Sequence, residues 1–347
     1  MSYKKVIEVH RGGRMESSHF GHAAIVNTDG DLLYSIGNPQ RVTYARSSVK
    51  PIQTIPIVET GAADYYNLQD KDLALFCSSH SSEEQHTSTV SNLLKRAGLY
   101  EENLQCGSHI PFSDDVYRSL IQQKQEPTPL YSNCSGKHTG MLLTAKYLGE
   151  SLDDYYKQEH PVQQRILNTM AEAAQYPKAE IAIGLDGCGV PVFGLPIDKL
   201  AHTFARLARP EAFGEKRANA VARITGAMTK HPEMVAGTDR FCTDFMNVGS
   251  GRFFGKLGAE SVYCIGDKET GLGIAVKIED GDYKRALYPF VMEILVQLNI
   301  LTDSQVQGLD KYYQPKIRNA RNEIIGEIIP SFVLEKSQSG FNSNHLS

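Results

Sequence analysis

Residues 44–56, YARSSVKPIQTIP, place a lysine, Lys50, three residues after a serine, Ser47. Proline is tolerated in the first turn of a helix, because the N–H that it lacks would have no partner there. Pro51 therefore predicts a helix that begins close to this point, with Ser48 as its N-cap residue. Because residues three apart on a helix are neighbours, Ser47 and Lys50 are expected to lie together at the mouth of an apolar helix.

This pair is suited to nucleophilic catalysis. A serine hydroxyl needs a base in order to attack a carbonyl carbon, and a lysine can serve when burial and a second cation lower its pKa. The residues after Lys50 are largely apolar, and backbone N–H groups at a helix mouth can stabilise an oxyanion. A lone Ser-x-x-Lys occurs by chance in many chains. The competing interpretation is a capping serine beside a lysine whose ammonium group reaches solvent.

Two further segments strengthen the catalytic interpretation. Lys256 and Gly258 form a Lys-x-Gly pair in GKLGAE, and Ser79 lies in CSSHSSEEQH after an apolar run. A Ser-x-x-Lys helix followed by a Lys-x-Gly strand is the order found in penicillin-binding proteins and β-lactamases. The glycine is expected to let a substrate lie close to the strand. Lys256 would then be the second cation near Lys50.

The two ends of the chain are rich in β-strand patterns, and the middle is more helical. Apolar runs at 4–10 and 21–37, the latter with a turn at Asp29-Gly30, are matched by short runs over 251–282. We predict an α+β fold in which N- and C-terminal strands pair in one antiparallel sheet covered by helices. We expect a single catalytic domain over 1–347. The remaining predicted parts are helical stretches at 153–176, 211–234 and 284–302, a helical insertion at roughly 45–235 and a flexible tail at 336–347.

The amino-acid composition argues against some classes of binding partner. The 347 residues include 36 basic and 40 acidic side chains, a net charge of -4, which gives no footprint for nucleic acid or an anionic membrane. The start of the chain has no apolar core typical of a signal peptide, and no apolar run approaches membrane-spanning length. We expect a cytoplasmic protein, whose six scattered cysteines are thiols, metal ligands or nucleophiles.

Together these motifs resemble the L-asparaginase II family, the serine–lysine type that is unrelated to the threonine-dependent bacterial asparaginases. The resemblance covers about residues 9–280 and implies a fold similar to serine β-lactamases, penicillin-binding proteins and serine-dependent glutaminases. It also implies hydrolysis of L-asparagine to L-aspartate and ammonia. The matching segments are RSSVKPIQ, CSSHSSEEQH, NCSGKHTGML, GLDGCGVPVF, VAGTDRFCTDFM and KLGAESVY.

The resemblance assigns the family's catalytic serines and lysines to Ser47, Lys50, Ser79 and Lys256. In the expected reaction Ser47 attacks the side-chain amide carbon, and Lys50 as a free amine takes the hydroxyl proton. Lys256 lowers the pKa of Lys50, and Ser79 relays a proton to the leaving ammonia. The alternative, in which Ser79 is the nucleophile and Ser47 the relay, stays open.

The resemblance further implies a zinc ion held by Cys134, Lys137 and Cys188, with Asp186 close by. Two thiolates suit zinc. Lysine is a rare ligand because it must lose its proton to bind metal, so that His138 is the more usual type of third ligand. The competing interpretation is two buried thiols or a disulfide.

Recognition of the substrate needs cations for the carboxylate and an anion for the ammonium group. Arg46 and Arg240 are candidates for the carboxylate, and Asp186 is the candidate for the ammonium. His80 and His138 are further candidates for substrate contact, although each could be structural.

Two other functions compete with an asparaginase. One is a glutaminase or a β-lactam-type hydrolase with the same machinery, since one methylene discriminates by only about 1–3 kcal/mol. The other is a non-catalytic metal- or amino-acid-binding protein. For any of these we expect a homodimer, with no nucleic-acid or membrane partner.

Overall fold

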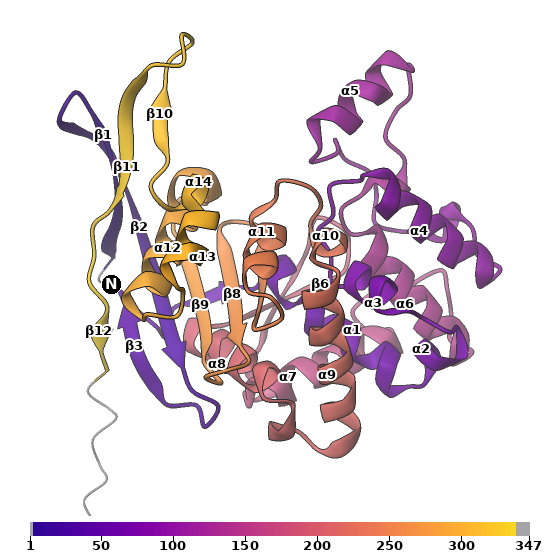
Figure 1. Cartoon of the computed structure of the whole chain (residues 1–347). Helices are drawn as coiled ribbons and strands as arrows, with labels where there is room; N and C mark the ends of the chain where they lie inside the picture. Colours follow the sequence, from indigo (N-terminus) through magenta and orange to yellow (C-terminus); the bar gives the residue numbers. More distant parts are fainter. Residues whose placement is uncertain (1–2, 338–347) are drawn as a thin grey trace, which may run out of the picture. The chain divides into compact units, whose positions relative to one another are not determined.

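The computed structural model describes residues 3–337, which form two compact units (Figure 1). Unit 1 comprises 3–48, 195–209 and 248–337, and unit 2 comprises 49–194 and 210–247. Residues 338–347 of the predicted tail lie outside the described residues. The single catalytic domain with an insertion at 45–235 stays a prediction.

Unit 1 contains a sheet built from both ends of the chain. β2 pairs antiparallel with β9, from Gly21 opposite Ile278 to Val26 opposite Gly273. β1 pairs antiparallel with β11. The α+β prediction, with N- and C-terminal strands in one antiparallel sheet, is therefore confirmed. The strands follow the order β10 (Lys316–Arg318), β11 (Ile324–Pro330), β1 (Lys4–Arg11), β2 (Arg14–Val26), β9 (Gly273–Ile278), β8 (Val262–Asp267) and β7 (Phe253–Gly258), with β3 (Leu32–Ile36) on β2 and β12 (Glu335–Lys336) on β3.

Helices pack on this sheet. α8 (Ile197–Ala208) contacts β2, β8 and β9, and it approaches β9 so closely that a Cβ at Gly273 would lie 1.9 Å from Ala201 O. α12 (Tyr288–Gln297) contacts β1 and β11 and follows a π-helical turn, η6 (Tyr283–Leu287). Two short helices, α13 (Asp303–Gly308) and α14 (Asp310–Tyr313), lead to the β10–β11 hairpin.

Unit 2 is mainly helical. α1 (Lys50–Glu59) is its central helix and contacts α6, α7 and α9. A hairpin of β5 (Ala182–Leu185) and β6 (Pro191–Pro196) is added to the helices. The other helices are α2 (Ala62–Tyr65), α3 (Asp70–Phe76), α4 (Glu84–Arg96), α5 (Asp114–Gln122), α6 (Ser135–Tyr147), α7 (Pro161–Ala174), α9 (Glu215–Lys230), α10 (Pro232–Val235) and α11 (Phe241–Val248), whose last residue belongs to unit 1.

The predicted helical stretches are shorter in the structure. The stretch at 153–176 is helical only from Pro161, because His160 accepts a hydrogen bond from Val162 N and caps the helix there. Proline as the first helical residue is typical of such a start. The stretch at 211–234 contains α9, and that at 284–302 contains α12.

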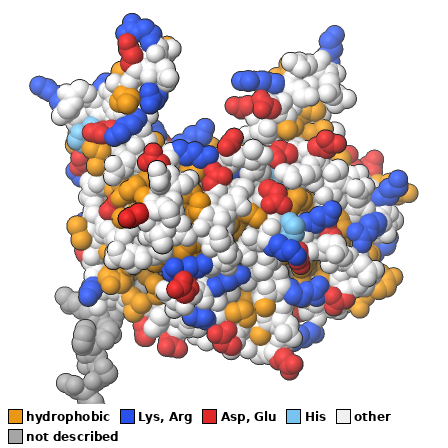
Figure 2. Space-filling view, viewed as in Figure 1, with side chains coloured by type: hydrophobic (Ala, Val, Ile, Leu, Met, Phe, Trp, Pro, Cys, Tyr) orange, Lys and Arg blue, Asp and Glu red, His pale blue; other side chains and the backbone are white. Residues whose placement is uncertain are grey.

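Two general expectations can be compared with the structure. All six cysteines are buried free thiols, which confirms that they are not disulfides. No helix within residues 3–337 is long and apolar enough to cross a membrane. Basic and acidic side chains are interspersed over the face drawn in Figure 2, in keeping with the nearly balanced composition.

Candidate active site

Ser47 lies on a single 3-10 turn, η1 (Arg46–Val49), directly before α1. The prediction that Ser48 caps α1 is wrong. Val49 holds the cap position and makes no side-chain cap bond, whereas the Ser48 hydroxyl donates 2.7 Å to Ala45 O. Arg46 has a φ of 51°, which is uncommon for a residue with a side chain. The turn that carries Ser47 therefore depends on bonds within residues 45–48 and on its neighbours.

The strand that carries Lys256 lies against this turn within unit 1. A Cβ at Gly258 would lie 2.5 Å from Ala45 O and 3.1 Å from Ser48 N, so only glycine fits there without a shift. The sequence predicted that Gly258 leaves room for a substrate; the structure gives it the role of admitting the turn. Lys256 itself is buried, and its Nζ donates 2.7 Å to Leu257 O.

In unit 2 the structure brings Lys50 and Ser79 together. Both side chains are buried, and Lys50 Nζ lies 3.3 Å from Ser79 Oγ. The same nitrogen donates to Ser78 O and, over 3.3 Å, to Asn133 O. A carbonyl can only accept, but a hydroxyl can accept or donate. If Lys50 is an ammonium group, it donates to both carbonyls and to Ser79. If it is a neutral amine, it donates to the two carbonyls and accepts a hydrogen bond from the Ser79 hydroxyl. The pair can therefore exchange one proton.

The loop that carries Ser79 follows α3 and is held on two sides. A Cβ at Gly136 of α6 would lie 2.4 Å from Leu75 O, so the glycine lets α6 lie directly against the end of α3. Ser79 N–H donates 2.9 Å to Val235 O. Ser81 Oγ donates 2.9 Å to Ala236 O. These contacts hold the Ser79 loop against α6 and against residues 235–236.

His80 lies inside unit 2, with both ring nitrogens bonded to protein groups. Its Nε2 is 2.8 Å from Ser135 Oγ, and its Nδ1 accepts 3.1 Å from Ser82 N. Burial, with the nearby His86, lowers the pKa of His80 well below its usual range. The predicted substrate contact by His80 stays untested, but the ring's observed bonds are structural.

Cys134, Lys137 and Cys188 also come together. Lys137 Nζ donates 3.0 Å to Cys188 Sγ. A hydrogen bond from Cys134, with the Lys137 charge, lowers the pKa of Cys188 well below its usual range although burial opposes this. The same bond to Cys188, with burial, raises the pKa of Cys134 to about 12. Burial alone would lower the pKa of Lys137, but the two thiol groups raise it. The hydrogen bond from Cys134 and the charge of Lys137 therefore favour the thiolate form of Cys188.

The side chains of Cys134, Lys137 and Cys188 meet some of the requirements of a zinc site. Within residues 3–337 no three His, Cys, Asp or Glu side chains gather in a metal-binding arrangement. Two sulfurs and one amine nitrogen nevertheless meet here, which fits a soft metal with three protein ligands and one open position. The fit requires Cys134 and Lys137 to lose their protons.

His138 is held away from the role of third ligand at its Nδ1. This atom lies 2.6 Å from Tyr155 OH, which itself accepts 2.9 Å from Gln105 N. Nδ1 is therefore occupied by the tyrosine hydroxyl, and the direction of this hydrogen bond depends on the tautomer of His138. Burial, with the charge of Lys137, lowers the pKa of His138 to about 3.

The candidate substrate-binding residues are divided between the units. Arg240 lies beside the Ser79 loop, with Nη1 3.1 Å from Ser81 Oγ and its guanidinium carbon 5.0 Å from the Phe112 ring centre. Asp186 lies in the β5–β6 turn, where its Oδ1 accepts 2.8 Å from Gly187 N. Arg46 belongs to unit 1.

Sequence reasoning missed the backbone carbonyls of Ser78 and Asn133 and the hydroxyl of Ser135. A carbonyl group is present at every position, so no residue type signals its use. Ser135 could have been noticed only because it lies inside the distinctive run NCSGKHTGML.

A buried serine–lysine pair on an α+β fold is typical of serine hydrolases that form acyl-enzymes. The model of the L-asparaginase II family matches residues 7–330, and the chain belongs to this family. The family assignment supports an amidohydrolase. Among curated proteins no sequence matches this chain significantly.

Solved structures with a similar arrangement share little sequence with this chain. A protein called Mglu has a TM-score of 0.46 and 14% identity, covering 81% of this chain and 64% of its own. A β-lactamase from Mycobacterium bovis has a TM-score of 0.41 and 16% identity, covering 80% and 94%. A D-alanine carboxypeptidase from Burkholderia cenocepacia has a TM-score of 0.34 and 12% identity, covering 76% and 88%.

The chain thus spans less than two thirds of the length of Mglu. All three TM-scores are below 0.5, and the family assignment rests on the sequence match.

Proposed function

We propose that this protein hydrolyses L-asparagine to L-aspartate and ammonia through a serine–lysine acyl-enzyme. The observation that carries the proposal is the buried contact between Lys50 Nζ and Ser79 Oγ, 3.3 Å apart. Such a pair can transfer a proton directly between side chains. An amide hydrolase needs such a transfer, because the leaving nitrogen must be protonated. Membership of the L-asparaginase II family supports asparagine as the substrate.

In the proposed reaction Ser47 Oγ attacks the side-chain amide carbon and gives its proton to neutral Lys50. The tetrahedral oxyanion is stabilised by backbone N–H groups near Ser47. The C–N bond then breaks, and the proton passes from Lys50 through Ser79 to the departing nitrogen, which leaves as ammonia. Water attacks the aspartyl ester, again with Lys50 as base, and releases aspartate.

Recognition of an α-amino acid needs both a carboxylate and an ammonium partner. Arg240 supports this role best, because its guanidinium is beside the Ser79 loop and is braced by Phe112. We assign the carboxylate to Arg240 and the ammonium group to Asp186, and Arg46 stays a candidate from the sequence. A guanidinium binds a carboxylate through two parallel hydrogen bonds, which lysine cannot reproduce.

Zinc is a second part of the proposal. Cys134, Lys137 and Cys188 would hold it, because their donor atoms already meet in one buried place. A bound zinc ion would supply a fixed positive charge that orients the substrate. No step of the proposed reaction passes through the metal. Cytoplasmic location and homodimerisation stay predictions from the sequence.

The test is ammonia release from L-asparagine and L-glutamine, measured side by side for the wild type and for Ser47→Ala. The proposal expects turnover of asparagine that the substitution abolishes. Faster release from glutamine would favour a glutaminase. Hydrolysis of a chromogenic β-lactam and of neither amide would favour a β-lactam hydrolase. Zinc or asparagine binding without any hydrolysis would favour the non-catalytic alternative.

A further inference from the structure

We infer that His80 is a positioning residue that holds Ser79 within reach of Lys50, by tying the Ser79 loop to the segment 133–135. This rests on the proposed function only in giving Ser79 a chemical role. The link between the Ser79 loop and the segment 133–135 is a hydrogen bond seen in the structure. His80 Nε2 lies 2.8 Å from Ser135 Oγ, and the histidine ring is fully buried.

The hydrogen bonds around His80 have only one consistent direction. Ser82 N–H donates to Nδ1, so the ring proton must be on Nε2. That proton is donated to Ser135 Oγ, and the Ser135 hydroxyl in turn donates 3.1 Å to Leu130 O. Both ring nitrogens of His80 and the Ser135 hydroxyl therefore have hydrogen-bonding partners, which gives the His80 ring a single orientation.

The ring also stabilises an unfavourable backbone. Ser82 has a φ of 64°, a region that residues with side chains rarely adopt. The bond from Ser82 N to His80 Nδ1 and a second bond from Ser82 Oγ to Tyr131 O hold this conformation. The His86 ring lies parallel to His80, with centroids 5.0 Å apart and an interplanar angle of 9°. His86 is itself bonded through Nε2 to Glu233 O at 2.9 Å.

The segment 133–135 holds both members of the proton-exchanging pair. Asn133 O accepts from Lys50 Nζ, and Ser135 Oγ accepts from the ring that follows Ser79 directly. The His80–Ser135 bond therefore sets the position of Ser79 relative to the carbonyl that orients Lys50. Proton transfer requires hydrogen-bond distances, and a displacement of about 1 Å can cost a large factor in rate.

The experiment separates the two bonds of the ring with near-isosteric variants. His80→Asn keeps an acceptor at the position of Nδ1 and removes the donor at Nε2, whereas His80→Gln keeps a donor near Nε2. Ser135→Ala removes the acceptor, and the double variant His80→Asn/Ser135→Ala closes a thermodynamic cycle. His160→Asn is the matched control, because His160 makes the same type of bond to Val162 N, at 3.2 Å, and also bonds Ser151 O.

With asparagine as substrate, His80→Asn and Ser135→Ala are each expected to lower kcat about tenfold with KM nearly unchanged, the effect of one lost hydrogen bond. The double variant should lose no more than either single variant, and His80→Gln should keep most of the activity. His160→Asn should keep wild-type kcat. Full kcat in His80→Asn, or losses that multiply in the double variant, would overturn the inference. A fall in melting temperature alone would indicate a purely structural histidine and would overturn it too.

Amide hydrogen exchange of residues 78–82, followed by mass spectrometry, provides a readout that does not depend on activity. The inference expects faster exchange in this segment for His80→Asn and Ser135→Ala, but not for His160→Asn. If the wild type hydrolyses no amide while this pattern holds, the proposed function fails and the positioning stands. Unchanged exchange in both variants contradicts the positioning whatever the activity.

Discussion

Lys50 Nζ lies 3.3 Å from Ser79 Oγ, and the two groups are buried together in unit 2. The lysine of the Ser-x-x-Lys motif thus has a second serine, far along the chain, as its hydrogen-bonding partner. Lys50 Nζ also donates to the carbonyls of Ser78 and Asn133, which can only accept. The hydrogen bond between Lys50 and Ser79 can run in either direction, because a hydroxyl can donate or accept. The amine at the start of this apolar helix is therefore buried with hydrogen-bonding partners rather than exposed to solvent.

Replacing Lys50 tests this arrangement. Lys50→Met removes the amine and keeps the length of the side chain, so we expect kcat to fall by about 10²–10⁴-fold, as for loss of a general base. The carbonyls of Ser78 and Asn133 lose a donor, at a cost of about 1–3 kcal/mol in stability. Lys95→Met, on the exposed end of α4, is the control and should leave both quantities nearly unchanged. Ammonia release and thermal unfolding measure the two effects; retained turnover in Lys50→Met would refute the base assignment.

A second prediction concerns the contact between Gly258 and the turn that carries Ser47. In Gly258→Ala the new methyl group would lie 2.5 Å from Ala45 O, so the turn must shift. We expect about 1–3 kcal/mol of lost stability, as for overpacking, together with a fall in kcat. Gly226→Ala in α9 is the matched control. Nothing lies within 4 Å of its added carbon, and it should stabilise the helix by about 0.5–1 kcal/mol. Equal melting temperatures for the two variants would contradict the steric account.

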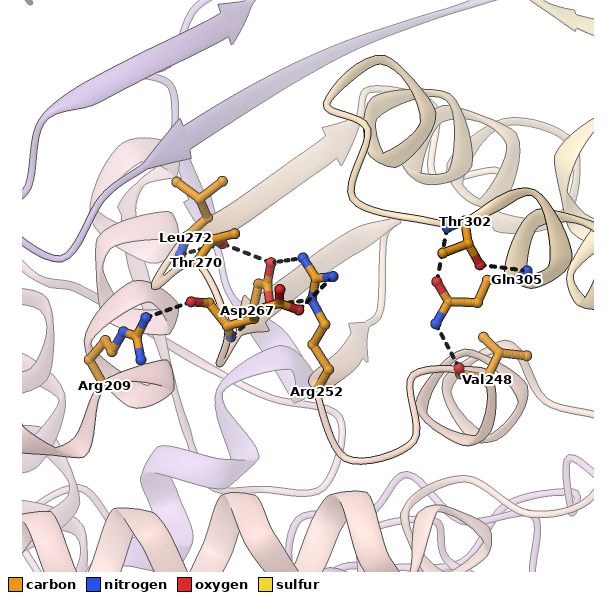
Figure 3. A network of polar contacts seen from close by, with 9 residues as sticks. Arg209, Val248, Arg252, Asp267, Thr270, Leu272, Thr302 and Gln305 are labelled. Atoms are coloured by element: carbon orange, nitrogen blue, oxygen red, sulfur yellow. Dashed lines mark hydrogen bonds and ion pairs between the residues drawn. The ribbon is translucent and has the colours of Figure 1, made fainter.

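The third prediction concerns the Arg252–Asp267 pair in unit 1 (Figure 3). Arg252 donates 2.8 Å from Nε and 2.7 Å from Nη2 to the buried carboxylate of Asp267, which Thr270 also bonds at 2.7 Å. Burial favours the neutral carboxyl, but these hydrogen bonds outweigh it and lower the pKa of Asp267. A lowered folded-state pKa stabilises the protein above the unfolded pKa of about 3.9.

Asp267→Asn should therefore cost about 1.5–3 kcal/mol near pH 7, the range for hydrogen bonds to charged groups. The difference from wild type should shrink as pH falls from about 4 through the folded-state pKa. Denaturant unfolding at several pH values measures it, with exposed Asp115→Asn as the control. A difference that is the same at every pH would show that the ion pair contributes no net stability.

Zinc binding is the fourth prediction. Calorimetric titration of metal-free protein should give one zinc per chain, lost in Cys188→Ala and kept in Cys242→Ala, because Cys242 is buried but is not one of the three proposed ligands. Because thiol and ammonium ligands must lose their protons to bind metal, zinc binding should release protons and the zinc affinity should rise with pH. Binding that is unchanged in Cys188→Ala would place the metal elsewhere.

Much of the fold could be predicted from local patterns. The hairpin turn at Asp29-Gly30 and the apolar runs of 251–282 indicated the sheet, because alternation and turn residues are local signals. The start of α7 could not be placed, since the capping bond of His160 and the loop before it override the helical periodicity. The β10–β11 hairpin was missed because its strands, KIR and IIGEIIP, follow a polar region, and because β11 pairs with β1 from the other end of the chain.

The site was less predictable than the fold. The motifs made Ser47, Lys50, Ser79 and Lys256 candidates, but the partner of Lys50 depends on tertiary structure. Ser48 was expected to cap α1. A 3-10 turn precedes the helix instead, and the Ser48 hydroxyl donates its hydrogen bond to Ala45 O within that turn. The burial of His80 and its bonds to Ser82 and Ser135 could not be predicted, because sequence shows residue types and not burial.

The most direct test of the account is to trap the acyl-enzyme. Wild type, Ser47→Ala and Ser79→Ala are mixed with L-asparagine, quenched in acid within the first turnover, digested and examined by mass spectrometry. The account predicts an aspartyl adduct on the peptide that contains Ser47, absent in Ser47→Ala and still formed, more slowly, in Ser79→Ala. An adduct on Ser79, or ammonia release by Ser47→Ala at the wild-type rate, would contradict Ser47 as the nucleophile.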